Sequence, residues 1–294
     1  MTASAAAGAR TRPRWSIGRR TLEIEKPILM GIVNVTPDSF SDGGVSFPAD
    51  RAIARALELL AQGADVLDIG GESTRPGAVP VDPDEEVRRV IPVIEGVLAA
   101  DPDAVISVDT VKSAVAARAL EVGASIVNDV SGLRLDPAMA DTCARSGCGV
   151  VLMHSRGSVS QMASYELATY GPDPVGEVMR ELGEGVHRAV ASGIEIGSLV
   201  LDPGIGFSKK SEHSLALLRQ LDRVCGLGFP VMVGLSRKRV IGEMTGVSVA
   251  AERDAGSVGA AVASLVRGAR LFRVHEVGMH RQALDAAWGV LSGQ

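Results

Sequence analysis

Aromatic residues are scarce in this chain: they make up 3% of its 294 residues, whereas glycine occurs 34 times. A core with few large rings must be built mainly from Ala, Val, Ile and Leu, with many close backbone approaches. The hydrophobic fraction of 46% and the charged fraction of 22% are those of an ordinary globular protein. The composition therefore favours an aliphatic α/β protein with a sizeable core.

The chain also lacks a strong charge of one sign, since 30 Lys and Arg oppose 35 Asp and Glu and leave a formal net charge of −5. Such a chain has no bulk attraction to nucleic acid or to anionic lipid. No apolar run approaches the roughly 18 residues of a membrane span. The longest, residues 255–266, is interrupted by Gly and Ser. We therefore expect a soluble protein with neither a nucleic-acid nor a membrane partner.

Cysteine is rare as well, and the three present are Cys143, Cys148 and Cys225. Their odd number, and the lack of a CxxC or Cys/His spacing, indicate neither a disulfide framework nor a zinc site. This pattern predicts a reducing compartment, the cytoplasm.

The N-terminal segment has no acidic residue before Glu23 but carries five arginines. Organelle transit peptides share this composition, but here no amphipathic helix or apolar region follows. We therefore interpret residues 1–14 as a disordered Arg/Ala-rich tail and residues 15–294 as a single domain. Alternating segments at 15–17 and 21–25 predict a short β-hairpin at the start of that domain.

Short apolar runs rich in β-branched residues recur eight times. They occupy residues 28–33, 66–69, 105–108, 125–127, 150–153, 199–201, 231–234 and 271–274. Continuous apolar runs fit strands buried on both faces, and the segments between them, such as 50–62 and 84–99, have helical periodicity with Asp50 and Asp84 as expected N-caps. No linker divides the series. This favours a single-domain α/β fold, a (β/α)8 TIM barrel. A doubly wound sheet remains the alternative, because the number of strands alone does not show that the sheet closes.

Polar or charged residues follow every predicted strand, where a barrel holds its reactive groups. They are Asn34, Asp68, Asp109, Asn128 with Asp129, His154, Asp202, Ser236 to Lys238, and Arg273 with His275. Helix capping would explain one or two of these residues but not all of them. The sequence therefore predicts an active site at the carboxyl ends of the strands.

Two polar, glycine-containing loops, residues 34–44 and 70–77, follow the first two strands. The second contains Arg75, whose guanidinium suits planar anions. Neither loop is a Walker or GxGxxG phosphate loop. Together they predict lids that close on a small substrate.

At these segments the chain resembles the dihydropteroate synthase family. The matching motifs are residues 34–44, 70–77, 107–110, 128–132, 202–207, 236–238 and 273–275, in the family's order, and the likeness extends from Trp15 to Trp288. The resemblance implies a barrel, usually a homodimer, that joins 7,8-dihydropterin-6-ylmethyl diphosphate to 4-aminobenzoate. The products would be diphosphate and 7,8-dihydropteroate, on the pathway to folate. The resemblance also implies a target for sulfonamides.

The resemblance assigns residues to two organic substrates. A buried carboxylate such as Asp202 can accept two parallel hydrogen bonds from the amine and ring N–H of a pterin; the alternative for an inward Asp is a salt bridge with Arg237 or Lys238. The pterin set is Asp109, Asn128, Met153, Asp202, Phe207, Lys238 and Arg273. The aminobenzoate set is Phe40, Thr74, Arg75, Pro76, Ser236 and Lys238.

Diphosphate needs cations or oriented donors, and barrels often bind phosphate after their last two strands, where Arg273 and His275 share one strand face. The resemblance adds Asn34, both to this site and as the protein ligand of Mg2+, the one cofactor expected. It assigns catalytic roles to Lys238, Arg75 and Asp38. We interpret the other histidines, His187, His213 and His280, as structural.

Some positions depart from the family pattern, namely Ser208, Lys210, Glu276 and residues 155–174, and none has an assigned role. Three alternatives remain: an inactive pterin-binding paralogue, a pterin-dependent methyltransferase that serves a corrinoid, and a scaffold protein. The intact site residues argue against the first alternative. The Arg75 loop and the pair of Arg273 and His275 argue against the second, and a scaffold needs no reactive groups at all eight strand ends.

Overall fold

The main sheet of the computed structural model, which describes residues 13–36, 48–73 and 80–293, consists of eight parallel strands in the order β8-β7-β6-β5-β4-β3-β10-β9. The strands are β3 (Ile28–Asn34), β4 (Val66–Gly70), β5 (Ile106–Asp109), β6 (Ile126–Asp129), β7 (Gly149–Met153), β8 (Leu199–Asp202), β9 (Met232–Val233) and β10 (Leu271–Val274). A parallel bridge between Leu201 and Val231 joins the two ends of the sheet. The predicted barrel is confirmed, and each of the eight predicted runs contains a strand.

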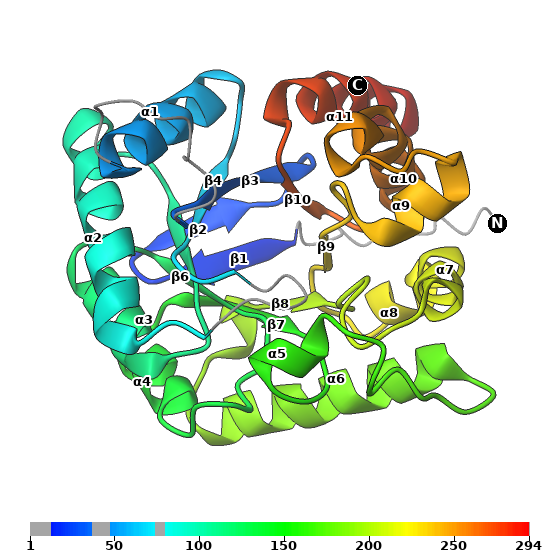
Figure 1. Ribbon diagram of the computed structural model, residues 1–294, viewed down its shortest axis with the longest axis horizontal. Helices are drawn as coiled ribbons and strands as arrows, with labels where there is room; N and C mark the ends of the chain where they lie inside the picture. The colour runs from blue at the N-terminus through cyan, green and yellow to red at the C-terminus, as the bar shows by residue number, and fades with distance from the viewer. Residues whose placement is uncertain (1–12, 37–47, 74–79, 294) are drawn as a thin grey trace, which may run out of the picture.

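Helices surround the strands (Figure 1). They are α1 (Pro48–Ala61), α2 (Pro83–Ala100), α3 (Ser113–Glu121), α4 (Met139–Ser146), α5 (Val159–Met162), α6 (Pro174–Ala191), α7 (Ser211–Arg219), α8 (Leu221–Cys225), α9 (Arg239–Thr245), α10 (Asp254–Val266) and α11 (Val277–Ser292), with short 3-10 turns at η2 (Ile196–Ser198) and η3 (Ala250–Arg253). None of the helices among the described residues is both long enough and apolar enough to cross a membrane.

The predicted helix caps were wrong. Asp50 and Asp84 lie within the first turns of α1 and α2, and the N-cap of α2 is Asp82, whose side chain accepts the N–H of Asp84. Both helices begin at a proline, which suits the first helical position because it has no N–H to satisfy and its φ is already helical. The two prolines therefore start the helices one or two residues earlier than the aspartates indicated.

The predicted hairpin is present as β1 (Arg14–Ile17) and β2 (Arg20–Glu23), paired antiparallel. Trp15 and Ile17 are fully buried against the first inward residues of the barrel strands, and the Trp15 indole donates to the carbonyl of Ser198 at 2.9 Å. The hairpin therefore packs against the amino end of the barrel and leaves the carboxyl ends to the site. The first 12 residues of the predicted tail lie outside the described residues.

Strand alternation positions the site. Residues two apart on a strand point to the same side, so the inside of the barrel is built in layers. The layer next to the hairpin is apolar and buried: Met30, Val66, Ile126, Val151, Val200 and Leu271. Two residues farther along the same strands stand Ile32, Asp68, Asn128, Met153, Asp202 and Arg273. An apolar floor thus supports a layer in which four of the six side chains are polar.

Candidate active site

Arg273 occupies the centre of the polar layer. From β10 its Nε donates to Asp68 Oδ2 of β4 and its Nη2 to Asp109 Oδ2 at the end of β5, each at 2.6 Å. Asn128 of β6 donates from Nδ2 to the same oxygen of Asp68 at 3.0 Å. Burial raises the pKa of Asp109, against the opposing effect of the Arg273 charge. Although burial opposes it, the two carboxylates hold the pKa of Arg273 above its usual range.

The salt bridges that the sequence offered as an alternative have other partners. Arg237 pairs with Asp254 at 2.9 Å and with Glu276 at 2.9 Å. Lys238 lies instead with its ammonium 3.8 Å from the centre of the Phe207 ring. The cation that pairs with the inward carboxylates is thus Arg273.

Asp202 and Lys238 carry the remaining charges of the layer. Asp202 is 3% exposed, and its Oδ1 accepts the N–H of Gly204 at 2.7 Å. Burial raises the pKa of Asp202 to about 6. Burial and, next, the Arg273 charge lower the pKa of Lys238 to about 8. At neutral pH the first group is an anion and the second a cation, so both can act on a polar substrate.

All seven residues of the predicted pterin set line one small hollow, of about 30 Å³, at the carboxyl ends of the strands. Three buried polar atoms of β4, β5 and β6, namely Asp68 Oδ1, Ser107 Oγ and Asn128 Oδ1, have no hydrogen-bond partner among the described residues, and Asn128 is the one of these residues that lines the hollow. Because native structures satisfy almost all buried polar atoms, the Asn128 oxygen points to a donor supplied by a ligand. A flat molecule with several N–H groups fits this requirement.

A larger cavity of about 600 Å³ adjoins the hollow and shares Asp109, Phe207, Lys238 and Arg273 with it. Asn34, Ser236 and His275, predicted for diphosphate and aminobenzoate, also line this cavity. His275 Nδ1 lies 2.9 Å from Ser236 Oγ, which links the ends of β9 and β10. The cavity thus brings the predicted diphosphate residues and the described aminobenzoate residues beside the hollow.

The described residues contain no group of three His, Cys, Asp or Glu side chains that could hold a metal ion. The amide oxygen of Asn34 at the cavity wall nevertheless fits a hard cation such as Mg2+, which keeps most of its waters and binds substrate phosphates with few protein ligands.

Five predicted site residues, Asp38, Phe40, Thr74, Arg75 and Pro76, lie outside the described residues. The described ends of the second loop are held together: Glu72 accepts the N–H of Val81 at 2.7 Å, and its other carboxylate oxygen lies 3.1 Å from Lys112 Nζ. Lys112 also pairs with the fully buried Glu86. The base of this loop is therefore anchored to α2 and to the end of β5.

The sequence placed Asp68 among the polar residues at the strand ends and Ser107 in a motif shared with the family, but it gave neither of them, nor Lys209, a binding or catalytic role. Asp68 stands two residues after the inward Val66, so strand alternation could have identified it as part of the polar layer. Ser107 carried no distinguishing signal. Lys209 is fully buried, and only the folded structure identifies its contact with His154, which is 55 positions away in the sequence.

Comparison with known proteins agrees with this geometry. Residues 30–275 match the family described as "Pterin binding enzyme". The dihydropteroate synthase of Neisseria meningitidis serogroup B is 45% identical over 282 residues, which cover 94% of this chain and 97% of that protein.

Among solved structures, the chain is likewise similar to dihydropteroate synthases. A Xanthomonas albilineans dihydropteroate synthase with 4-aminobenzoic acid is 46% identical with a TM-score of 0.89, covering 97% of this chain and all of that one. The enzyme from the same organism in complex with 7,8-dihydropteroate is 44% identical with a TM-score of 0.86, covering 96% of this chain and all of that one. The likeness thus extends over almost the whole chain in sequence and in fold.

The Arg273 cluster predicts a stability effect. Arg273→Met would leave two carboxylates in the barrel without their cation, so we expect the free energy of unfolding to fall by about 3 kcal/mol, as for other broken buried ion pairs. Urea denaturation at neutral pH measures this. The exposed pair of Arg14 with Glu23 is the control, and Arg14→Met should change stability by less than about 1 kcal/mol. Equal effects of the two substitutions would contradict a structural role for the cluster.

Proposed function

The chain belongs to the dihydropteroate synthase family of pterin-binding enzymes, and we propose that the residues of the hollow and the cavity perform that family's reaction. The reaction joins 7,8-dihydropterin-6-ylmethyl diphosphate to 4-aminobenzoate and yields 7,8-dihydropteroate and diphosphate, in folate biosynthesis. The observation that carries the assignment of roles is the single hollow lined by the seven residues expected to bind the pterin. The larger cavity beside it provides room for the second substrate and the leaving group.

The hollow would bind the pterin by its polar edge. The Asp202 carboxylate accepts two hydrogen bonds from the exocyclic amine and the neighbouring ring N–H, while the unpartnered Asn128 Oδ1 accepts a further donor. Met153 and Phe207 form apolar walls, and Arg273 of β10 reaches the same ring system. Discrimination comes from the buried acceptors, which a ring without matching donors would leave unsatisfied.

The chemical step breaks the bond between the pterin methylene carbon and the diphosphate oxygen, and the bonding electrons leave with diphosphate. Positive charge then develops on the methylene and the electron-rich pterin, near the carboxylates of Asp109 and Asp202. Asn34, Arg273 and His275 bind the departing diphosphate. Asn34 would hold Mg2+, which would supply further positive charge there when bound. The aminobenzoate nitrogen forms a bond to the methylene carbon with its lone pair, and the proton that it loses passes to the departing diphosphate or to water.

Aminobenzoate would occupy the larger cavity. Ser236 and Lys238 lie there beside Phe207, so Lys238 can contact both the pterin and the incoming amine. The resemblance adds Phe40, Thr74, Arg75, Pro76 and Asp38 to this pocket. Sulfonamides, which have the shape of aminobenzoate, would compete for the same space. The three free cysteines fit a reducing compartment, and we propose the cytoplasm as the place of action.

The decisive experiment is an assay of diphosphate release from 7,8-dihydropterin-6-ylmethyl diphosphate with Mg2+, with and without 4-aminobenzoate, and with dihydropteroate identified by mass. We expect release that depends on aminobenzoate. Lys238→Ala should lower kcat by at least about 100-fold, because it removes the cation between the two substrates. Lys210→Ala, which changes an exposed lysine immediately before α7, should retain wild-type kcat.

Two results would contradict this proposal in different ways. Near-normal turnover by the Lys238→Ala variant would remove Lys238 from the mechanism. Pterin binding by calorimetry without any product from the wild-type protein would identify the chain as an inactive binding paralogue.

Binding of the pterin ring should depend on pH through Asp202. Because burial raises the pKa of this carboxyl to about 6, it is ionised above that pH and protonated below it. Protonation replaces one acceptor by a donor, so the affinity for a dihydropterin without phosphate groups should fall by about tenfold between pH 7.5 and about pH 5. Calorimetry measures this. Asp202→Asn should bind weakly at both pH values, whereas the exposed Asp84→Asn should retain the wild-type profile.

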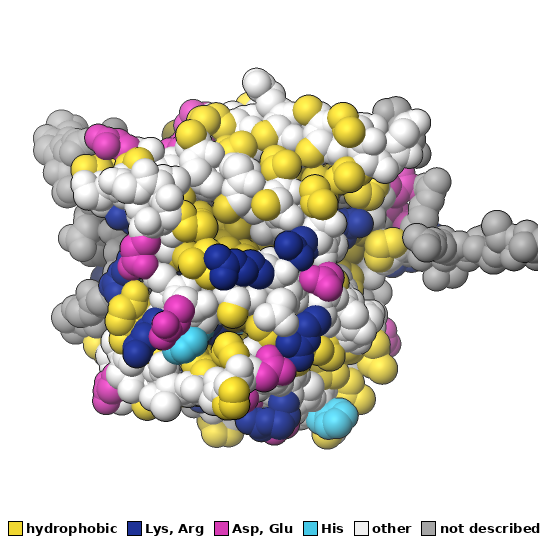
Figure 2. Space-filling model, turned by 90° about the vertical axis from the view of Figure 1, so that its right-hand side faces the viewer, with side chains coloured by type: hydrophobic (Ala, Val, Ile, Leu, Met, Phe, Trp, Pro, Cys, Tyr) yellow, Lys and Arg dark blue, Asp and Glu magenta, His cyan; other side chains and the backbone are white. Residues whose placement is uncertain are grey.

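We also propose a homodimer formed through α10 and α11. Large apolar side chains are exposed on these helices: Val266 is 63% exposed, Val290 85% and Leu291 50%. In Figure 2, hydrophobic side chains gather over the upper half of the visible face, where these helices lie, and charged groups gather over the lower half. Association would cover this surface, because contiguous exposed apolar patches usually mark interaction sites.

Light scattering on a sizing column tests the dimer. We expect the wild-type protein to elute as a dimer and Val266→Glu to elute as a monomer, because the substitution would bury a charge in the contact. Ile196→Glu is the matched control, since Ile196 is 62% exposed on η2. A monomeric wild-type protein, or dissociation by both substitutions, would exclude this interface.

A further inference from the structure

A fully buried lysine that the mechanism does not use, Lys209, lies at the wall of the larger cavity, next to the turn that carries two residues of the pterin hollow. Lys209 is 1% exposed and stands two residues before α7. Its ammonium contacts four acceptors among the described residues: His154 Nδ1 at 2.7 Å, the carbonyl oxygens of Gly204 and Phe207 at 3.0 Å each, and the His154 carbonyl at 3.3 Å. Ring and carbonyl dipoles, rather than a carboxylate, therefore surround this buried group.

These acceptors belong to two neighbouring strand ends. His154 follows β7, and Gly204 and Phe207 lie in the turn that follows β8. The two segments touch so closely that a Cβ on Gly204 would lie 1.9 Å from the His154 carbonyl oxygen, and Gly204 has a φ of +66°. The Lys209 ammonium thus binds both segments next to the place where they touch.

The turn bound by Lys209 carries two pterin-site groups. Asp202 begins it and accepts the N–H of Gly204, and Phe207 closes it by donating its N–H to the Gly204 carbonyl at 3.0 Å. The Phe207 ring in turn contacts the Lys238 ammonium. Two of the carbonyls that Lys209 binds, those of Gly204 and Phe207, therefore determine where the carboxylate and the aromatic wall of the hollow lie.

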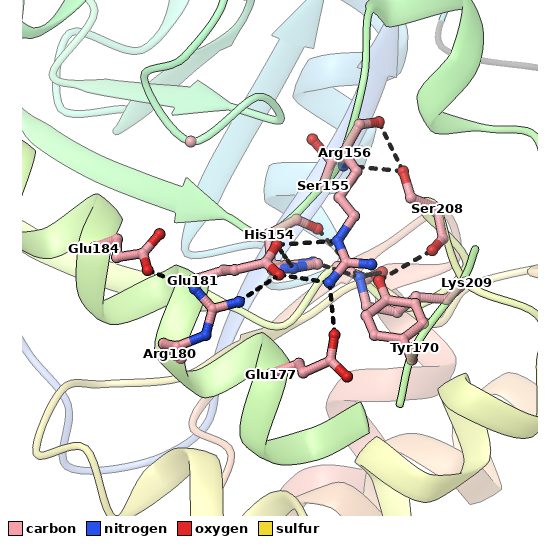
Figure 3. Close-up of polar contacts among 12 residues, drawn as sticks. His154, Ser155, Arg156, Tyr170, Glu177, Arg180, Glu181, Glu184, Ser208 and Lys209 are labelled. Carbon is pink, nitrogen blue, oxygen red and sulfur yellow. Dashed lines mark hydrogen bonds and ion pairs between the residues drawn. The ribbon is translucent and has the colours of Figure 1, made fainter. Parts of the chain in front are cut away.

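A second group of contacts orients the histidine (Figure 3). His154 Nε2 lies 3.0 Å from Glu181 Oε2 of α6, and Arg156 binds the same carboxylate. Although burial opposes it, these contacts hold the pKa of Glu181 below its usual range, and burial lowers the pKa of His154 to about 4. The neutral ring therefore carries its proton on Nε2, toward Glu181. Its Nδ1 is left as an acceptor for Lys209.

Arg156, which binds Glu181, also connects α6 to the segment that contains Lys209. Arg156 stacks on the Tyr170 ring at 4.1 Å, and the Tyr170 hydroxyl donates to the carbonyl of Ser208 at 3.0 Å. The Ser208 hydroxyl accepts from the N–H of Arg156 at 2.9 Å and donates to its carbonyl at 2.8 Å. Figure 3 shows these contacts running from α6 to residues 208 and 209. Ser208, a departure from the family pattern, is thus part of this support.

We propose that Lys209 is a positioning residue for the pterin: it holds the Asp202–Phe207 turn in its binding geometry, with His154 and Glu181 fixing the acceptor that orients it. This inference rests on the proposed function for the identity of the ligand. Burial lowers the pKa of Lys209 to about 7, against the opposing charge of Asp202. A buried ammonium is unfavourable by itself, so its retention at this position accords with a role in the site.

The test compares Lys209→Met, which keeps the length of the side chain but has no donor, with Lys210→Met one residue later on the exposed side. Dihydropterin affinity is measured by calorimetry, and the two KM values and kcat are measured in the diphosphate assay. Lys209→Met should raise the dihydropterin Kd and the pterin KM by about tenfold or more, because misplacement of the binding groups is costly. The KM for aminobenzoate, measured at saturating pterin substrate, should stay within about twofold of the wild-type value. The Kd, both KM values and kcat of Lys210→Met should also stay within about twofold of the wild-type values.

Hydrogen exchange in the ligand-free protein separates this role from general stability and from the reaction itself. Lys209→Met should speed exchange at the amides of residues 204–207 and leave those of the barrel strands unchanged. Uniformly faster exchange, or a dihydropterin Kd within about twofold of the wild-type value, would overturn the proposal. If the wild-type protein makes no product, the proposed function fails, but exchange and dihydropterin binding still decide the role of Lys209.

Substitutions at His154 provide a second test should Lys209→Met not fold. His154→Asn places an amide oxygen where Nδ1 stands, whereas His154→Leu supplies no acceptor. Asparagine should keep most of the dihydropterin affinity, and leucine should lose about as much as Lys209→Met, at least about tenfold. Equal affinities of the two variants would show that the acceptor for Lys209 is irrelevant to the site.

Discussion

The guanidinium of Arg273 between Asp68 and Asp109 is the interaction on which the site depends most. Charges buried in a barrel are costly unless ion pairs or hydrogen bonds with good geometry compensate them. Here the last strand of the chain supplies the cation, and β4 and β5 supply the carboxylates, so the cluster forms only when β10 pairs with β3, the first strand of the barrel. The ionic layer thus couples closure of the barrel to the arrangement of groups above its floor.

The apolar floor and the polar layer divide two tasks between them. Trp15 and Ile17 of the hairpin pack below the first inward layer, which supplies hydrophobic stabilisation without any polar atom to satisfy apart from the indole N–H. The next layer contains buried acceptors that have no hydrogen-bond partner in the part of the chain that the structure describes, among them Asn128 Oδ1. The floor thus contributes hydrophobic stabilisation at the amino end of the strands, and the layer above it presents polar groups to the hollow.

Support for the hollow comes from both of its sides. On one side, Lys112 joins Glu72 and Glu86 and anchors the base of the second loop. On the other, Lys209 and His154 join the segments that follow β7 and β8. In both places a lysine from a neighbouring segment binds the base of a loop, so rigid strand ends, rather than the loops themselves, position the binding groups.

The sequence by itself determined the eight strands and the hairpin, because continuous apolar runs and alternation are local signals. Its ordered motifs also singled out, through the family resemblance, seven residues that the structure brings to one hollow. It did not determine the first residues of α1 and α2, which begin one or two residues before the predicted starts. In each helix a proline and a nearby aspartate are both plausible starting residues. Only the tertiary structure decided which charges pair. Arg273 meets Asp68 across 205 positions of sequence, and Lys209 meets His154 across 55. Such partners are set by barrel closure and burial, which no local pattern records.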